Sequence, residues 1–164
     1  MALYRSARIG KGGKPFTLYK IKTLRDGADS RLFADGGEYT TFGHFLRRTK
    51  LDELPQLWNV LKGDMAFVGP RPEEQRTIDV LQKETRATLL SVKPGLTSLA
   101  SVHFFDEERL LQETTNPQSL YWKGIKPLKI LLDVFYIQNK CFLLDVAVVY
   151  MTLKKVLLSP FTHD

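Results

Sequence analysis

The chain has 164 residues, which fits one domain of ordinary size, large enough to bury a core without disulfides or a structural metal. Hydrophobic residues make up 43% and charged residues 26% of it, a balance typical of folded proteins, which argues against disorder. The formal net charge of +6 indicates an anionic partner, but nucleic acid, nucleotide phosphates and an acidic membrane surface would all meet that demand.

The cysteine and histidine content excludes two classes of stabilising site. Cys141 is the single cysteine of the sequence, so it has no partner for an internal disulfide. His44, His103 and His163 show no metal-ligand spacing with it. A reducing cytoplasm is therefore the expected compartment. No apolar run reaches the roughly 18 residues of a spanning helix, so we expect that the chain does not cross a bilayer by itself.

The N-terminal segment has the pattern of a β-hairpin. Residues 3–8 and 15–24 are strand-like and flank a glycine-rich stretch at 10–14. Gly12 and Gly13 suit a turn that needs positive φ. The spacing of a phosphate-binding P-loop is absent, so we interpret this stretch as the tip of the hairpin.

Two short helices are expected next, after a polar surface loop at residues 25–39. Apolar spacing predicts one helix from Thr41 and a second through Leu61, and the two meet near Asp52. Gly63 follows the last apolar residue of the second helix and therefore suits a C-terminal cap.

The rest of the chain is predicted to be mainly helical. Prolines favour an irregular loop at 69–72, and Lys93-Pro-Gly95 favours a turn. The expected helices cover residues 73–90, 105–114, 128–138 and 142–158. The last helix carries an apolar stripe, typical either of packing on a core or of an interfacial helix resting on lipid. The predicted fold is α+β: one mostly helical domain over residues 1–164, with an N-terminal β-hairpin and an amphipathic C-terminal helix.

An acidic pair, Asp52 and Glu53, stands at the expected start of the second helix, just before Pro55. Acidic side chains in a first turn stabilise the helix dipole by a few tenths to about 1 kcal/mol, which alone explains most such pairs. The alternative is chemical, because two carboxylates could hold Mg²⁺ between themselves and phosphate oxygens.

Basic residues near this pair favour the chemical interpretation. They are Lys20, Lys22, Arg47, Arg48, Lys50 and Arg71. Three of them immediately precede the carboxylates, one lies in the proline-stiffened loop, and two alternate with apolar residues on the second strand. Such a set of cations could hold a pyrophosphate, although spacing alone leaves the assignment open.

Three strings in order carry a resemblance to a known family. They read Leu-Asp-Glu-Leu-Pro-Gln-Leu from Leu51, Asn-Val-Leu-Lys-Gly-Asp-Met from Asn59 and Val-Gly-Pro-Arg-Pro from Val68. This order is similar to the signature of the bacterial sugar transferases, the monotopic phosphoglycosyl transferases. Residues 16–23, 92–97 and 133–145 resemble that family's strand, turn and closing segment, so the likeness runs from about residue 3 to residue 158.

The resemblance implies an enzyme that moves a sugar 1-phosphate from a UDP-sugar to polyprenyl (undecaprenyl) phosphate. It would act at the cytoplasmic face of the bacterial inner membrane and initiate exopolysaccharide, O-antigen, capsule or other glycan assembly. Asp52 matches the family nucleophile, which expels UMP and holds the phosphosugar as an acyl phosphate. Glu53, with Asp52, matches the Mg²⁺-binding pair. Lys20, Arg47 and Arg71 match cations that the family places around the phosphates.

Two features depart from the family pattern. The family turn usually continues Gly-Leu-Thr-Gly with a nearby Gln, whereas this chain has Ser98 and then Ser101. That region is implicated in nucleotide-sugar recognition, so the uridine and sugar preferences stay open. Family members also begin with a membrane-embedded helix before the hairpin. This chain starts inside the hairpin, so we expect the anchor to be absent and membrane attachment to be peripheral.

Two alternatives remain. A basic nucleic-acid-binding module would need its cations on one face with aromatic stacking partners, but the basic residues are interleaved with the acidic pair, so we expect no nucleic acid. A catalytically degenerate partner of a complete transferase would keep the fold without the activity, and the intact pair argues against it. The sequence does not indicate the sugar, the pathway or the oligomeric state.

Overall fold

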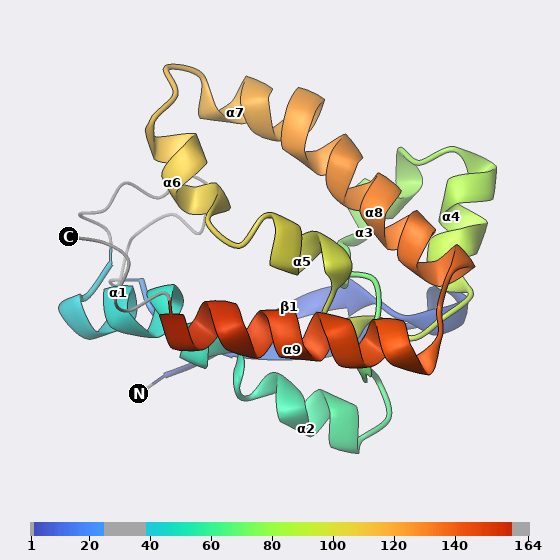
Figure 1. The fold of residues 1–164 in the computed structure, drawn as a ribbon, viewed down its shortest axis with the longest axis horizontal. Coiled ribbons are helices and arrows are strands. Elements are labelled where there is room, and N and C mark those ends of the chain that lie inside the picture. The colour runs from blue at the N-terminus through green and yellow to red at the C-terminus, as the bar shows by residue number, and fades with distance from the viewer. Residues whose placement is uncertain (1, 25–38, 159–164) are drawn as a thin grey trace.

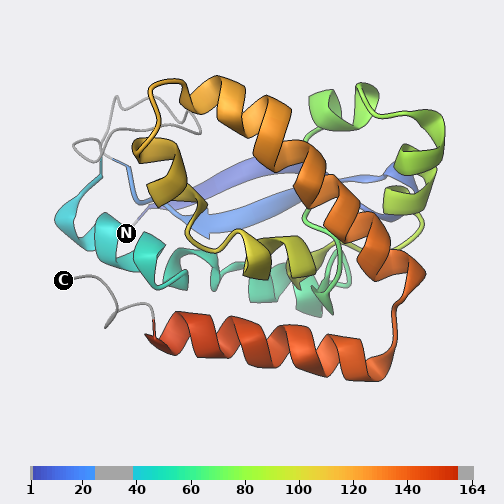
Figure 2. The same cartoon turned by 45° about the horizontal axis from the view of Figure 1, so that its top comes forward.

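The computed structural model of the chain describes residues 2–24 and 39–158, apart from the side chains of Thr41, His44 and Arg48. Helices surround a long two-stranded hairpin in both views of the molecule (Figures 1 and 2). The surface loop predicted at 25–39 falls, except for Tyr39, outside the described residues.

The predicted hairpin is confirmed. Strands β1 (Leu3–Ile9) and β2 (Pro15–Ile21) pair antiparallel, and the register sets Leu3 opposite Ile21. At the tip, Gly12 and Gly13 take φ values of 69° and 76°, which a residue with a Cβ rarely adopts. The second strand ends at Ile21 rather than at residue 24, and Leu24 pairs only through an isolated bridge to Tyr39.

Two short helices follow, joined by a tight turn. Helix α1 (Thr41–Arg48) begins after Thr40, whose hydroxyl accepts a hydrogen bond from the Gly43 amide at 2.9 Å. Helix α2 (Gln56–Leu61) ends before Gly63, whose φ of 82° confirms the predicted glycine cap. Between the helices lies a separate 3₁₀ turn, η3 (Leu51–Glu53), so the acidic pair does not start α2 itself.

A second, very small sheet was not predicted. Strands β3 (Ala66–Val68) and β4 (Gly95–Thr97) pair in parallel, with Ala66 opposite Gly95. Three-residue strands are too short to show an alternation in the sequence. Gly95 permits this pairing, because a Cβ there would lie only 2.2 Å from the backbone nitrogen of Gly69.

The single helix predicted over residues 73–90 is wrong. The segment forms α3 (Gln75–Asp79) and α4 (Lys83–Leu90), separated at Gln82, where ψ is 147° and the backbone is extended. The break redirects the chain so that α4 packs against the hairpin tip and the long helix α8 (Lys126–Gln138). Apolar periodicity on both sides of the break conceals it in the sequence.

The last third contains the expected helices and additional short ones. Helices α6 (Glu107–Gln112), α8 and α9 (Phe142–Leu158) correspond to the predicted segments. Helix α5 (Leu99–His103), α7 (Pro117–Leu120) and a π-helical turn (Tyr121–Ile125) were not predicted. The π-helical turn leads from α7 into α8 without a break, and the three form one long arm of the molecule (Figure 1).

The main core lies where α5, α8 and α9 meet β3. Its buried members are Val68, Val102, Tyr136 and Val148. Tyr136 also donates a hydrogen bond to the Asp145 carboxylate at 2.5 Å, which ties α8 to the start of α9. The architecture is therefore the predicted α+β domain with an N-terminal hairpin.

Helix α9 packs on the core through one face and exposes apolar side chains on the other. Val148 is fully buried against α5 and the small sheet, whereas Phe142 and Leu143 are 79% and 77% exposed. Within the part of the chain that the structure describes, no helix has the length and apolar character needed to span a bilayer.

Candidate active site

The acidic pair lies on η3, between α1 and α2. Lys50, just before this turn, has a φ of 56°, and this left-handed residue lets the chain turn sharply after α1. The turn packs against β2. As a result Asp52 is only 3% exposed, and both carboxylates face side chains from distant parts of the sequence.

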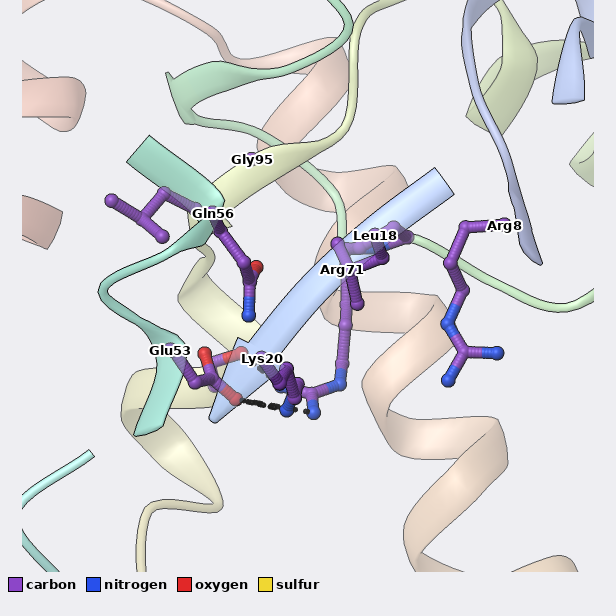
Figure 3. A pocket seen from close by; sticks show the side chains of 10 residues that line it. Arg8, Leu18, Lys20, Glu53, Gln56, Arg71 and Gly95 are labelled. Carbon is purple, nitrogen blue, oxygen red and sulfur yellow. Dashed lines mark hydrogen bonds and ion pairs between the residues drawn. The ribbon is translucent and has the colours of Figure 1, made fainter. Parts of the chain in front are cut away.

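Glu53 is held by two cations, as Figure 3 shows. Lys20, from the end of β2, donates a hydrogen bond to Glu53 Oε1 at 2.6 Å, and Arg71 Nη2 lies 3.8 Å from the same oxygen. Burial alone would raise the pKa of Glu53, but Lys20 and Arg71 together lower it well below its usual range. Glu53 is therefore an ionised carboxylate locked between two positive groups.

Asp52 is in a different state. Its Oδ2 lies 3.9 Å from Arg47 Nη1, while its Oδ1 is buried and has no hydrogen-bond partner among the described residues. Burial raises the pKa of Asp52, and the neighbouring Glu53 charge adds to this effect. A buried carboxylate oxygen without a partner is costly in a folded protein, which makes Asp52 a candidate site residue; Asp133 Oδ1 and Ser6 Oγ are in the same state among the described residues.

Arg47, on α1, lies near Asp52 but pairs mainly with another acidic residue, Glu108. Its Nε donates to Glu108 Oε1 at 2.8 Å, which is much closer than its approach to Asp52. Burial alone would lower the pKa of Arg47, but Glu108 raises it above its ordinary value. Glu108 thus holds the Arg47 guanidinium next to Asp52, but Arg47 makes no close ion pair with Asp52 itself.

Arg71 is positioned through its backbone. The loop that carries it is fixed by Gly95 N, which donates to Pro70 O at 2.9 Å, and by Arg71 N, which donates to Asp133 Oδ2 at 3.0 Å. Its side chain reaches Ser101 Oγ at 3.4 Å. Asp133 is buried on α8, and this burial raises its pKa to about 7.

The polar face of α8 was missed by the sequence analysis. Lys126, Lys129 and Asp133 are all buried, although they stand in an otherwise apolar helix. Lys126 pairs with Glu73 at 2.5 Å, and Lys129 pairs with Glu107 of α6. Their spacing of three and four residues would have placed them on one helical face, but only the fold shows that this face points inward.

All five predicted site residues meet around one cavity of about 510 Å³. The five are Lys20, Arg47, Asp52, Glu53 and Arg71. Lys50, Lys129, Glu107 and Glu108 line the same cavity and add charge to it. A much smaller pocket of about 40 Å³ is also lined by Lys20, Glu53 and Arg71 (Figure 3).

Asp52 and Glu53 could supply part of a Mg²⁺ ligand shell, but not a complete one. Within residues 2–24 and 39–158, no group of three or more His, Cys, Asp or Glu residues could enclose a metal ion. Mg²⁺, however, usually takes one or two carboxylates and completes its shell with water and substrate phosphates. The unpartnered Oδ1 of Asp52 beside the ionised Glu53 supplies such a partial ligand set.

Polar residues in the last turn of α2 and just after it hold the fold together. Asn59 is fully buried and donates to Thr17 O at 2.7 Å, which fastens α2 to the hairpin. Asp64 accepts a hydrogen bond from Asn59 at 3.4 Å and lies 3.6 Å from Lys62 Nζ. These contacts keep α2 and the adjoining η3 turn in place against β2.

The sequence matches the profile of the family described as Bacterial sugar transferase over residues 1–159. It is 38% identical over 158 residues to the protein named Uncharacterized sugar transferase EpsL of Bacillus subtilis (strain 168), covering 95% of this chain and 70% of that protein. It is 36% identical over 162 residues to the UDP-glucose:undecaprenyl-phosphate glucose-1-phosphate transferase of Caulobacter vibrioides, with 95% and 57% covered.

A third relative carries a different sugar in its name. The UDP-N-acetylgalactosamine-undecaprenyl-phosphate N-acetylgalactosaminephosphotransferase of Aeromonas hydrophila is 31% identical over 166 residues, which cover 94% of this chain and 35% of that protein. The chain thus spans between 35% and 70% of the length of these three relatives.

Proposed function

The chain belongs to the bacterial sugar transferase family, and we propose that it transfers a sugar 1-phosphate from a UDP-sugar to polyprenyl phosphate. The reaction would start the assembly of a bacterial polysaccharide or related glycan. The observation that carries this proposal is the buried Asp52, which lines a cavity rich in cations and whose Oδ1 has no hydrogen-bond partner among the described residues. The names of two relatives, which pair a UDP-sugar with undecaprenyl phosphate, support it.

The proposed chemistry proceeds in two displacements at phosphorus. In the first, one carboxylate oxygen of Asp52 bonds to the β-phosphorus of the UDP-sugar, the bond from that phosphorus to the bridging oxygen breaks, and UMP leaves with that oxygen. The phosphosugar remains as an acyl phosphate on Asp52. In the second, a phosphate oxygen of the polyprenyl phosphate attacks the same phosphorus, and the Asp52 carboxylate is released.

The surrounding side chains have distinct tasks in this scheme. Arg47 and Arg71 would balance the charge that develops on the transferred group, because both line the cavity beside the pair. Lys20 would hold Glu53 ionised and in place through their 2.6 Å contact. Glu53 and Asp52 would ligate Mg²⁺, and the ion, when bound, would offset the charge of the diphosphate.

The exposed apolar side chains support a membrane-surface location for this chemistry. Trp58 and Leu61 on α2 are 59% and 79% exposed, and α9 presents Phe142 and Leu143 to solvent as well. A polyprenyl phosphate keeps its chain in the bilayer, so its enzyme must work at the headgroup plane. We propose a peripheral position at the cytoplasmic face, where UDP-sugars are available.

The identity of the released nucleotide tests this function. The chain would be mixed with undecaprenyl phosphate in detergent, Mg²⁺ and either UDP-glucose or UDP-N-acetylgalactosamine, and the nucleotides separated by chromatography. Transfer of a sugar 1-phosphate releases UMP, whereas transfer of the sugar alone releases UDP. UMP formation that needs the acceptor for multiple turnovers supports the proposal. Release of UDP, or no consumption of any UDP-sugar, would contradict it.

A further inference from the structure

The large cavity has two walls of opposite character. One wall carries the charged groups described above, from β2, η3, α6 and α8. The other wall is apolar and consists of Leu54, Phe67 and the α9 residues Val149, Leu153 and Val156. A cavity that accepted only a nucleotide-sugar would have little use for an aliphatic wall, because that substrate is polar along most of its length.

The two walls also differ in their exposure. On the charged side Asp52 and Lys129 are 3% and 4% exposed, whereas the side chains of Arg71 and Glu108 at its edge are 38% and 37% exposed. On the apolar side Leu54, Phe67 and Leu153 are 51%, 61% and 55% exposed. The apolar side of the cavity is therefore partly exposed to solvent, whereas the Asp52 carboxylate is buried.

This arrangement matches a ligand with an anionic head and an apolar tail. We propose that the apolar wall formed by Leu54, Phe67, Val149, Leu153 and Val156 binds the first isoprene units of the acceptor, and so aligns its phosphate with Asp52. This inference rests on the proposed function, because it assigns a place to the second substrate of that reaction.

The size of the cavity limits how many isoprene units of the acceptor it can hold. About 510 Å³ is within the range of small-ligand sites and far below what a long polyprenyl chain occupies. Only the isoprene units next to the phosphate fit beside the sugar phosphate, and the remainder of the chain leaves past the partly exposed apolar side. Burying these units would favour a prenyl phosphate over a phosphate with a shorter apolar group.

Water-soluble acceptors test the proposal without a membrane. The second displacement would be measured with isopentenyl phosphate and with geranyl phosphate, which carry the same head and differ by one isoprene unit. We expect the wild type to show a KM about tenfold lower for geranyl phosphate, because one more apolar unit is buried. Val149→Trp, which fills the apolar side, should abolish this preference.

Val146→Trp is the matched control. Val146 stands one turn earlier on α9, is half exposed and does not line the cavity. This variant should keep the tenfold preference. UMP release in the absence of acceptor should proceed alike in the wild type and in Val146→Trp, and unchanged circular dichroism spectra would show that both variants are folded.

Three results would overturn the inference while leaving the proposed function intact. They are an equal KM for both acceptors in the wild type, an undiminished preference in Val149→Trp, and a higher UDP-sugar concentration for half-maximal rate in the single-turnover release of UMP by Val149→Trp without acceptor. The last would assign the apolar wall to the nucleotide. Failure of the wild type to release UMP from any UDP-sugar would instead refute the proposed function, and the inference with it.

Discussion

Asp52 and Glu53 are neighbours in the sequence, but their surroundings give them different properties. Glu53 is paired directly with Lys20 and stays ionised, whereas Asp52 keeps one oxygen free of any described partner and has a raised pKa. The two carboxylates thus have different environments, which fits the different tasks proposed for them. An isolated helix-dipole role would not require Asp52 to be buried.

The first residue-scale prediction concerns Arg71. Replacing it by Ala should lower kcat/KM for the UDP-sugar at least about tenfold, because a charge-assisted contact to the phosphates would be lost. Arg109→Ala serves as control, since Arg109 is exposed on α6 and pairs only with Glu113 at 3.5 Å among the residues described. Steady-state UMP release would measure both, and equal losses would refute the assignment of Arg71.

A second residue-scale prediction concerns the pH dependence of stability at Asp133. Its pKa rises to about 7 in the folded protein through burial, so the native state keeps this proton at pH values where the unfolded chain has lost it. The free energy of unfolding should therefore fall as the pH rises from about 4 through 7. Asp133→Asn should remove that slope and keep an oxygen to accept the Arg71 amide.

Urea denaturation of both proteins at pH 5 and pH 8 would measure this difference. We expect the wild type to lose up to a few kcal/mol relative to the Asn variant across this interval, since each unit of pKa shift is about 1.4 kcal/mol. Parallel behaviour of the two proteins would show that Asp133 is not protonated in the fold. Asp133→Ala, which leaves the Arg71 amide without an acceptor, should be less stable than the Asn variant at both pH values.

Residue identity was predictable from the sequence where the residues match family motifs, and less so elsewhere. Lys20, Arg47 and Arg71 were identified beside the acidic pair, and the structure brings them around one cavity with it. Glu108 and Lys129 were not, because their contacts join segments tens of residues apart. A charged residue within an apolar helical pattern does not reveal which face of the helix will be buried.

At the scale of elements, the short β3 and β4 pair is the feature that positions the Arg71 loop. Gly95 brings the two strands together, and its amide donates to the carbonyl oxygen of Pro70. Gly95→Ala should destabilise the fold by at least about 2 kcal/mol, because the new Cβ would meet backbone rather than a movable side chain. UMP release should fall as well, since the loop must shift.

Gly124→Ala provides the control. A Cβ at Gly124 would lie 3.4 Å from a Leu120 methyl group, which can move, so this variant should unfold near the wild-type temperature. Thermal denaturation followed by circular dichroism distinguishes the two cases. Equal melting temperatures for both variants would show that the close backbone approach at Gly95 does not contribute to the stability of the fold.

Elements with strong local signals were predicted well. The hairpin has its glycine turn, α2 has its glycine cap, and α9 has a long apolar pattern. The failures share a cause: β3, β4 and α5 have only a few residues each, and the break between α3 and α4 is imposed by packing against other parts of the chain. Such features depend on tertiary contacts rather than on local propensity.

At the scale of the whole molecule, exposed apolar side chains and net positive charge together predict weak binding to anionic membranes. Leu143→Glu on α9 should reduce co-sedimentation with phosphatidylglycerol vesicles severalfold at low salt, because it puts a negative charge on the contact surface. Val80→Glu is the control, since Val80 is similarly exposed, at 79%, but lies between α3 and α4. Equal losses would indicate a purely electrostatic attraction without an apolar contact through α9.

The fold class follows from sequence patterns, and the family follows from motif order that the profile match supports over residues 1–159. The orientation of the cavity, with one apolar wall and one charged wall, could not be predicted. It arises from the way α9 crosses the domain on the side of α5 away from α8 (Figure 2), a placement that periodicity does not encode.

In the proposed reaction Asp52 forms a covalent bond to the phosphosugar. Intact-protein mass spectrometry detects such a bond directly. Wild type mixed with UDP-N-acetylgalactosamine or UDP-glucose, without acceptor, should gain the mass of one sugar phosphate, and fragmentation should assign it to Asp52. The Asp52→Asn variant should remain folded, gain no mass and release no UMP. Turnover by Asp52→Asn at the wild-type rate, or an adduct on another residue, would contradict the account.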